Sequence, residues 1–170
     1  EGMKEALTAF VNQGGILILT YMSGIVDQSD NVYLGGYPGP LRELAGVWVE
    51  EIDALFPDQK NQMIFADGRE AECGIVCDIM HLEGAEALAV YGSDFYKDRP
   101  VVTRNAYGEG STYYIGSDPS EEGIEMILDK VREEAGISGA SGEKGRLEIV
   151  SRWNGEQEYG FLMNFTDQVL

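Results

Sequence analysis

The sequence has few basic residues, a single histidine, two cysteines and no long apolar run. Lysine and arginine together number 12 against 30 aspartates and glutamates, so the net charge is −18. Proteins bind nucleic acids and anionic membrane surfaces through Lys and Arg, and this charge therefore argues against both partners. A membrane-spanning helix needs about 18 apolar residues or more, whereas the most hydrophobic run, Ile16–Leu19, is far shorter.

The two cysteines, Cys73 and Cys77, match neither a CxxC redox motif nor a zinc-ligand spacing. On a regular strand they would share a face about 13 Å apart, too far for a disulfide. We therefore predict two buried, reduced thiols, which fit a reducing cytoplasm. No residue pattern indicates a cofactor or metal site.

The composition is that of a globular chain. Its 170 residues are 44% hydrophobic and 10% aromatic, which is too apolar for disorder and enough for one domain, or one domain and part of another. Apolar residues at helical spacing predict a helix over about 2–13, which Gly14 and Gly15 end. The run 16–21 then predicts a strand buried on both faces.

A helix, a glycine turn and a buried strand are typical of an α/β unit with a parallel sheet. Because the opening strand of that unit is absent, and the chain starts without Met, we expect it to be cut from a larger protein. A long glycine-rich loop follows over 22–40, and loops of this length are usually functional or interfacial. Pro40 begins a short predicted helix that Gly46 ends, and 47–49 begins a short extended segment.

The rest of the chain predicts mainly strands. They are expected at about 72–80, 86–91, 100–106 and 111–116, the last two joined by a glycine hairpin. Asp118 is the expected N-cap of a helix that has Pro119 as its first residue and ends at Gly136. We divide the chain into a module over 1–136, a linker over 137–145, and a first hairpin of a further β domain over 146–170.

One pattern suggests an enzyme. His81 and Glu83 form a His-x-Glu pair, which in class I glutamine amidotransferases serves a cysteine nucleophile. That chemistry needs the cysteine on a tight strand-to-helix turn, whereas the residues after Cys73 continue as a strand. A structural histidine is therefore the default, and a divergent amidotransferase-like cysteine hydrolase using Cys73 or Cys77 is the alternative. We assign no catalytic residue.

Aromatic residues mark a candidate interface. Those in or beside the 22–40 loop are Tyr21, Tyr33, Tyr37 and Trp48. Aromatics are favoured in protein–protein contacts because they bury large areas at little entropic cost. A second group, Tyr91, Phe95 and Tyr96, fits a core and an interface equally well. Exposed, stacked aromatics would instead indicate a carbohydrate-binding module, which is a further alternative.

Several segments, in this order, resemble one family. They are GGILILTYMSGIVD (14–27), LGGYPGPLR (34–42), LEGAE (82–86), YGSDFY (91–96) and GEG (108–110). Together they resemble the trimerisation domain of the β-galactosidases of glycoside hydrolase family 42. Arg152 and the strand at 162–165 look like the start of that family's C-terminal β domain.

The resemblance implies a partial flavodoxin-like (class I glutamine-amidotransferase-like) three-layer α/β sandwich, followed by the start of a β-sandwich. It implies a non-catalytic assembly module, whose parent hydrolyses terminal β-galactosides with retention. The catalytic glutamates and the galactoside would belong to a (β/α)8 barrel outside this sequence. The parent would be a trimer. For this fragment we expect a dimer or higher oligomer, because strand 16–21 would have lost a neighbour.

Overall fold

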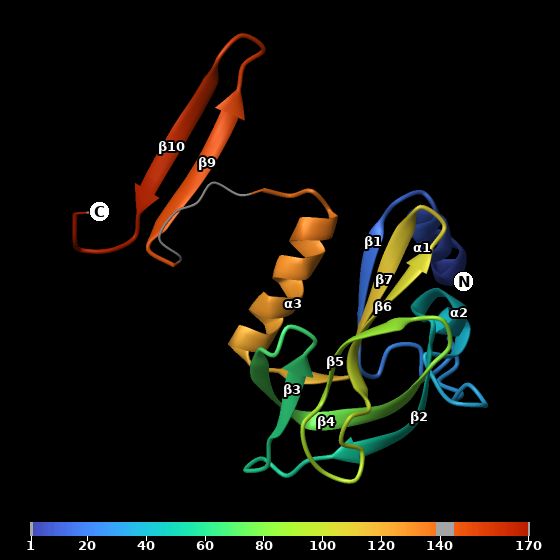
Figure 1. Ribbon diagram of the computed structural model, residues 1–170. Coiled ribbons are helices and arrows are strands. Elements are labelled where there is room, and N and C mark those ends of the chain that lie inside the picture. Colours follow the sequence, from blue (N-terminus) through green and yellow to red (C-terminus); the bar gives the residue numbers. More distant parts are fainter. Residues whose placement is uncertain (1, 139–144, 170) are drawn as a thin grey trace. The chain divides into compact units, whose positions relative to one another are not determined.

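The computed structural model describes residues 2–138 and 145–169. They divide into two compact units, one ending at Val131 and the other beginning at Arg132 (Figure 1). The first half of the chain contains α1 (Met3–Asn12), β1 (Ile16–Thr20), the short 3-10 helix η1 (Gly39–Leu41), α2 (Arg42–Ala45), β2 (Val47–Ala54), β3 (Asn61–Phe65) and β4 (Glu70–Leu82). The second half contains β5 (Glu86–Tyr91), β6 (Pro100–Tyr107), β7 (Gly110–Ile115), β8 (Ser117–Pro119), α3 (Glu121–Glu134), β9 (Leu147–Trp153) and β10 (Glu158–Asn164).

The predicted start of the fold is confirmed. Apolar spacing produces α1, and the chain turns at Gly14, whose φ of 97° is accessible to glycine without a steric penalty. β1 follows at once. Its Ile18 packs with the core cluster that contains Ile127 of α3, whereas Leu19 packs with the cluster that contains Val11 of α1. Because successive strand residues point to opposite faces, β1 is covered on both sides.

The sheet is mixed, which corrects the predicted parallel sheet. Its order is β1-β7-β6-β5-β3-β4-β2, with β8 paired to β4. Among the strands of the described residues, β1 and β7 are the one parallel pair of this sheet, and its other pairs are antiparallel. The antiparallel part follows from short connections, such as the turn between β6 and β7, because parallel neighbours need a long crossover.

Two strands were absent from the prediction, and one boundary was wrong. β3 and β8 were not expected, and β2 is a full strand of 8 residues where a short segment was predicted. Pro119 belongs to β8 and does not begin the helix. The first turn of α3 is capped by Ser120, whose Oγ accepts a hydrogen bond from the Gly123 N–H at 3.3 Å. Ser120 follows the strand directly and offers the same capping oxygen as an aspartate.

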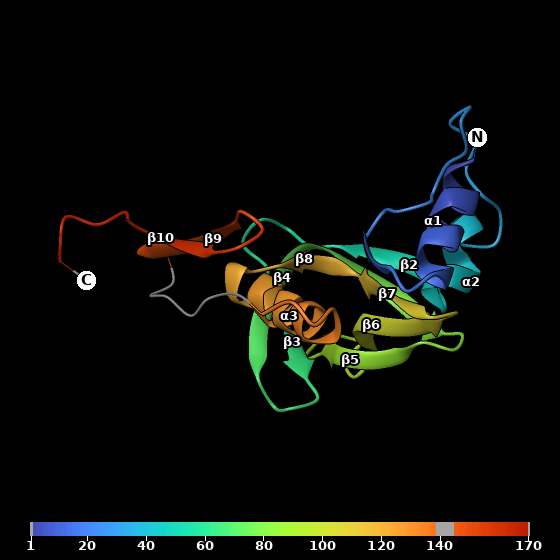
Figure 2. The ribbon, with the colours of Figure 1, turned by 90° about the horizontal axis from the view of Figure 1, so that it is seen from above.

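Helices lie on both faces of the sheet. α1 and α2 lie together, away from α3, in both views (Figures 1 and 2). The cluster on their side includes Val11, Leu44 and Tyr114, and the cluster that includes Ile127 of α3 contains Met63 and Phe65. The coarse α/β prediction is confirmed by this arrangement.

The second unit contains a two-stranded sheet. β9 and β10 form an antiparallel hairpin whose turn contains Asn154 and Gly155, as the Asn-Gly signal predicted. Most of the predicted linker, residues 139–144, lies outside the described residues. The division of the chain into domains stays a prediction. In the described part of the chain no helix has the length and apolar character needed to cross a membrane.

Candidate functional site

The 22–40 loop connects β1 to η1 and has a defined internal structure. Val26 pairs with Val32 in an isolated bridge. Asp27 Oδ1 accepts hydrogen bonds from the backbone N–H groups of Ser29 at 2.7 Å and Asn31 at 3.0 Å. These two bonds hold the pKa of the exposed Asp27 carboxyl below its usual value. The first half of the loop is therefore a small, hydrogen-bonded hairpin.

Tyr37 attaches the second half of the loop to the core. The Val49 N–H of β2 donates to the Tyr37 carbonyl at 2.7 Å, and the two residues form an isolated bridge. The Tyr37 side chain is 8% exposed, and its hydroxyl donates to Oδ1 of Asp78. Burial and this bond raise the pKa of Tyr37, so it stays a neutral donor.

Asp78 is the buried acceptor at the centre of this contact. It lies on β4, is fully buried, and also accepts a hydrogen bond from the Tyr114 hydroxyl of β7 at 2.8 Å. Burial raises the pKa of Asp78 to about 6, because desolvation disfavours the charged form more than the two hydrogen bonds favour it. One carboxyl thus joins the loop, β4 and β7.

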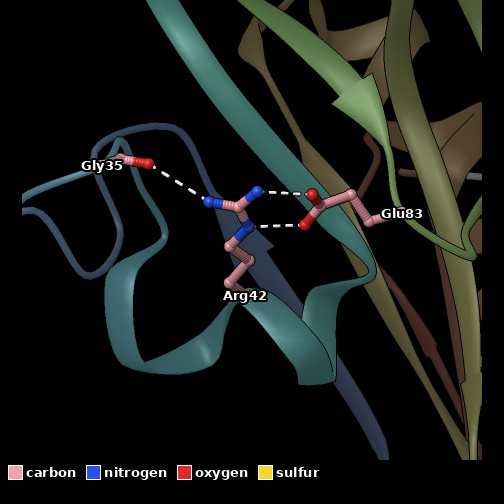
Figure 3. A network of polar contacts seen from close by, with 3 residues as sticks. All are labelled: Gly35, Arg42 and Glu83. Atoms are coloured by element: carbon pink, nitrogen blue, oxygen red, sulfur yellow. Dashed lines mark hydrogen bonds and ion pairs between the residues drawn. The ribbon is translucent and has the colours of Figure 1, made fainter.

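A second attachment is made by Arg42, the first residue of α2. Its guanidinium forms a two-point ion pair with the carboxylate of Glu83 and donates to the carbonyl of Gly35 at 3.2 Å (Figure 3). The pKa of Glu83 is lowered, first by the hydrogen bonds from Arg42. This bidentate geometry fixes the position of the loop backbone beside α2.

Trp48 on β2 contacts the same part of the loop, at Gly36. Its ring stacks on His81 with centroids 4.8 Å apart, and the Arg42 Cζ lies 5.2 Å from its centroid. A Cβ added to Gly36 would lie 2.0 Å from Trp48 Nε1, and Gly36 has φ 85°. Only glycine therefore fits where the loop crosses this indole.

The four candidate interface aromatics mainly point inward or lie half-buried. Tyr37 is buried, whereas Tyr33 and Trp48 are half-buried, and Tyr33 lies against Gly39. Tyr21 lies beside a different pocket, which residues of β1, β7 and α3 line, and burial followed by Asp118 raises its pKa. The tyrosines of the loop thus act as supports for its backbone.

Besides the polar residues 28–31, the loop presents four large apolar side chains to solvent. Their exposed fractions are 53% for Met22, 44% for Val26, 63% for Val32 and 99% for Leu34. Sequence reasoning missed them because it weighed aromatic residues only. Large apolar residues are unusual in a glycine-rich loop, and their presence in the sequence could have indicated an exposed apolar surface there.

The second aromatic group divides between core and surface. Tyr91 and Tyr96 are buried, and the Tyr96 hydroxyl donates to Asp53 Oδ2 at 2.8 Å. The Tyr91 hydroxyl donates to the Gly116 carbonyl at 2.9 Å. Phe95 is 73% exposed. The core interpretation therefore holds for the two tyrosines.

The residues of the enzyme alternative are engaged elsewhere. His81 Nε2 lies 2.7 Å from Glu50 Oε2, and Glu83 is paired with Arg42. Cys73 and Cys77 are buried in the core cluster on the side of α3. Within residues 2–138 and 145–169, no group of three or more His, Cys, Asp or Glu side chains is placed to hold a metal ion.

Comparisons with known proteins agree on one family. The model described as "Beta-galactosidase trimerisation domain" matches residues 1–138. A β-galactosidase of Planococcus sp. is 43% identical over 169 residues, covering 96% of this chain and 25% of the relative. One of Alicyclobacillus acidocaldarius is 43% identical over 176 residues, covering 98% and 25%.

Solved structures give the same result. The β-galactosidase of Bacillus circulans sp. alkalophilus matches with a TM-score of 0.87 and 40% identity, over 96% of this chain and 25% of that one. A catalytic mutant of Gan42B, a GH42 β-galactosidase from G. stearothermophilus, matches with a TM-score of 0.88 and 36% identity, over 99% and 25%. The chain spans about a quarter of the length of these relatives. It belongs to the trimerisation-domain family of the glycoside hydrolase family 42 β-galactosidases.

Proposed function

We propose that this chain holds together the subunits of a β-galactosidase, and that the exposed aliphatic residues of the 22–40 loop form part of the contact. One observation carries the placement. Leu34 is 99% exposed on a loop whose backbone is ordered on both sides of it, by hydrogen bonds within the loop at Asp27 and by the attachment of Tyr37 to Asp78 and Val49. Because the backbone of this loop is already ordered, a partner that covers it loses little affinity to the ordering of the loop.

The proposed partner is a second copy of the same protein. The family's description names trimerisation, and a closed threefold ring needs two different patches that meet on neighbouring subunits. The loop would supply one of them. We propose a trimer for the whole protein and a dimer or higher oligomer for the 170-residue chain. Among the described residues β1 has β7 as its one neighbour, so its other edge offers this chain an additional contact.

Replacing Leu34 by Asp tests the loop contact. Burying a leucine contributes about 1.5–3 kcal/mol, so Leu34→Asp should weaken association at least about tenfold in Kd. Light scattering across a dilution series measures the mass. Phe56→Asp is the matched control, because Phe56 is 71% exposed but lies at the turn after β2. Unchanged association of the Leu34 variant would exclude the loop from the contact.

Tyr37 is a poor choice for this test. Its side chain is buried and bonded to Asp78, so Tyr37→Ala removes core packing as well as any contact with a partner. A loss of association in that variant would not separate the interface from the fold.

For the whole protein we propose hydrolysis of terminal β-galactosides with retention of configuration. The support is the resemblance to family 42 and the identity of about 40% to β-galactosidases. The catalytic carboxylates and the galactoside site would lie in a barrel outside these 170 residues. The amidotransferase-like and carbohydrate-binding alternatives receive no support from the relatives. The reaction to measure is the hydrolysis of a chromogenic β-galactoside, with NMR to identify the anomer released first.

We propose that the complete module is a flavodoxin-like three-layer sandwich in which a further parallel strand pairs with β1. The parallel pair β1–β7 and the helices on both faces support this proposal. We propose a cytoplasmic location, which the two unbridged cysteines support. Fractionation of the source cells would test the location.

A further inference from the structure

The bend in β4 brings Cys73 and Cys77 much closer together than a regular strand would. Both cysteines lie on β4 and pair with residues of β8. Cys73 pairs with Pro119, and Cys77 pairs with Ser117. Four steps along β4 therefore lie opposite two steps along β8. Two steps of a strand span about 6.6 Å, whereas the sequence predicted about 13 Å for these two cysteines.

A bulge at residues 74–76 causes this contraction. Ile75 has φ 60°, a left-handed conformation that is unusual for a β-branched residue. The Ser117 Oγ lies 2.6 Å from the Val76 carbonyl oxygen and 3.3 Å from that of Gly74. Both carbonyls therefore turn toward one hydroxyl, and the chain between the cysteines is folded out of the strand.

The two thiols face the same part of the core. Both belong to the same core cluster, with exposed fractions of 1% for Cys73 and 0% for Cys77. Interaction with the Cys77 thiol is the first cause of the raised pKa of Cys73, followed by burial. Interaction with the Cys73 thiol lowers the pKa of Cys77 against the effect of burial. The Cys77 Sγ also lies 3.8 Å from Ser117 Oγ.

We propose that Cys73 and Cys77 form a dithiol that low-molecular-weight disulfides oxidise to an intrachain disulfide across the bulge. The estimated separation of about 6.6 Å between the two Cα atoms falls within the range of roughly 4.4–6.8 Å that disulfides span. The bond would lock β4 where it passes from pairing with β3 to pairing with β2. This inference is independent of the self-association proposed above.

The reaction balances with oxidised glutathione as the oxidant. The Cys77 thiolate attacks one glutathione sulfur, the glutathione S–S bond breaks, and one glutathione leaves and takes up the Cys77 proton. The Cys73 thiolate then attacks the Cys77 sulfur and releases the second glutathione, which takes up the Cys73 proton. The protein loses two electrons and two protons, and one glutathione disulfide becomes two thiols.

The test is an equilibrium measurement, because restricted access to the buried thiols slows their exchange with glutathione without changing the equilibrium constant. The intact 170-residue chain is equilibrated with reduced and oxidised glutathione, once folded and once in denaturing guanidinium chloride. Exchange is stopped by alkylation, and mass spectrometry counts chains that have lost two hydrogens. We expect the equilibrium constant for the intrachain disulfide to be about tenfold or more higher in the folded chain, because the fold holds the thiols together.

Two single variants are the controls. Cys73→Ser and Cys77→Ser should show only the mixed disulfide with glutathione. If a variant does not fold, the comparison of the folded and denatured parent chain still decides the question. A constant in the folded chain equal to or lower than in the denatured chain would overturn the proposal. So would bonds only between chains, seen by non-reducing electrophoresis.

Discussion

At the scale of single residues, the Asp78 side chain on β4 is the hydrogen-bond acceptor that connects the loop and β7 to β4. Its two carboxylate oxygens accept hydrogen bonds from Tyr37 and Tyr114. No basic side chain contributes to its pKa shift. A buried carboxylate of this kind is costly when charged. Its proton is therefore linked to the stability of the fold.

The pKa of Asp78, about 6 against an ordinary 3.8, predicts a dependence of stability on pH. The folded state binds this proton more tightly than the unfolded state does. The contribution is therefore complete below pH 3.8 and is lost as the pH rises through about 6. Its size is about 3 kcal/mol, from 1.36 kcal/mol per pH unit.

Asp78→Asn removes this titration. We expect the unfolding free energy of the parent chain, relative to that of the variant, to fall by about 2 kcal/mol between pH 4 and pH 7. Urea unfolding at several pH values measures it. Asp58→Asn, at an exposed position, should leave the pH dependence unchanged. A constant difference between the parent and Asp78→Asn would show that this carboxyl does not titrate in that range.

At the scale of elements, β1 has one neighbour among the described residues, as the sequence led us to expect. The Tyr21 N–H donates to Ile115, and the Gly15 carbonyl accepts from Ser111, both of which belong to β7. Backbone groups of alternate residues point to opposite sides of a strand. Those of Ile16, Ile18 and Thr20 therefore point away from β7, toward the free edge.

Thr20→Pro tests whether this edge pairs with another copy. Proline removes the outward N–H of an exposed residue and leaves the bonds to β7 in place. We expect the variant to associate more weakly than the parent chain. Sedimentation velocity measures the association.

Thr20→Val keeps the N–H and is the matched control. If Thr20→Pro associates as strongly as Thr20→Val, the edge of β1 makes no contact in the oligomer. The Leu34→Asp measurement, repeated in the Thr20→Pro chain, then separates the loop contact from the edge contact.

At the scale of the whole molecule, the chain is a module whose relatives are about four times longer. Acidic side chains are abundant, with 30 in the sequence, but retaining hydrolysis needs two of them about 5 Å apart in a sugar-sized cleft. The structure uses its best-defined carboxylates otherwise: Asp78 and Glu83 join elements, and Asp27 shapes a loop.

We therefore expect the 170-residue chain to release no product from a chromogenic β-galactoside above the uncatalysed rate. The full-length protein should hydrolyse the same substrate. Enzyme-like turnover by the chain alone would contradict the assembly function. An inactive full-length protein would contradict the proposed reaction but leave the role in assembly open.

Patterns local in the sequence predicted much of the fold. The stripe in α1, the turn at Gly14, the short helix after Pro40 and the Asn154-Gly155 hairpin each depend on neighbouring residues. The segments shared with family 42 also lie in continuous stretches of sequence. What a short segment determines through its own backbone preferences and apolar spacing can be read from that segment.

The candidate site could be predicted only in part. The length and glycine content of the 22–40 loop indicated a functional segment, but not which of its side chains face solvent. Tyr37 points inward because its hydroxyl donates to Asp78, which lies 41 positions further along the chain. The residues near Tyr37 in the sequence do not indicate that acceptor. Leu34 stays outside because the loop backbone is held on both sides of it.

The sequence by itself determined the acidic surface, most helices and strands, and the family. Only the tertiary structure decided that the sheet is mostly antiparallel, that Asp78 is buried under two tyrosines, and that Cys73 and Cys77 lie close together. The physical reason is that register, burial and bulges depend on pairing between distant segments. The energy of such pairing depends on both segments, so neither segment alone is enough to predict it.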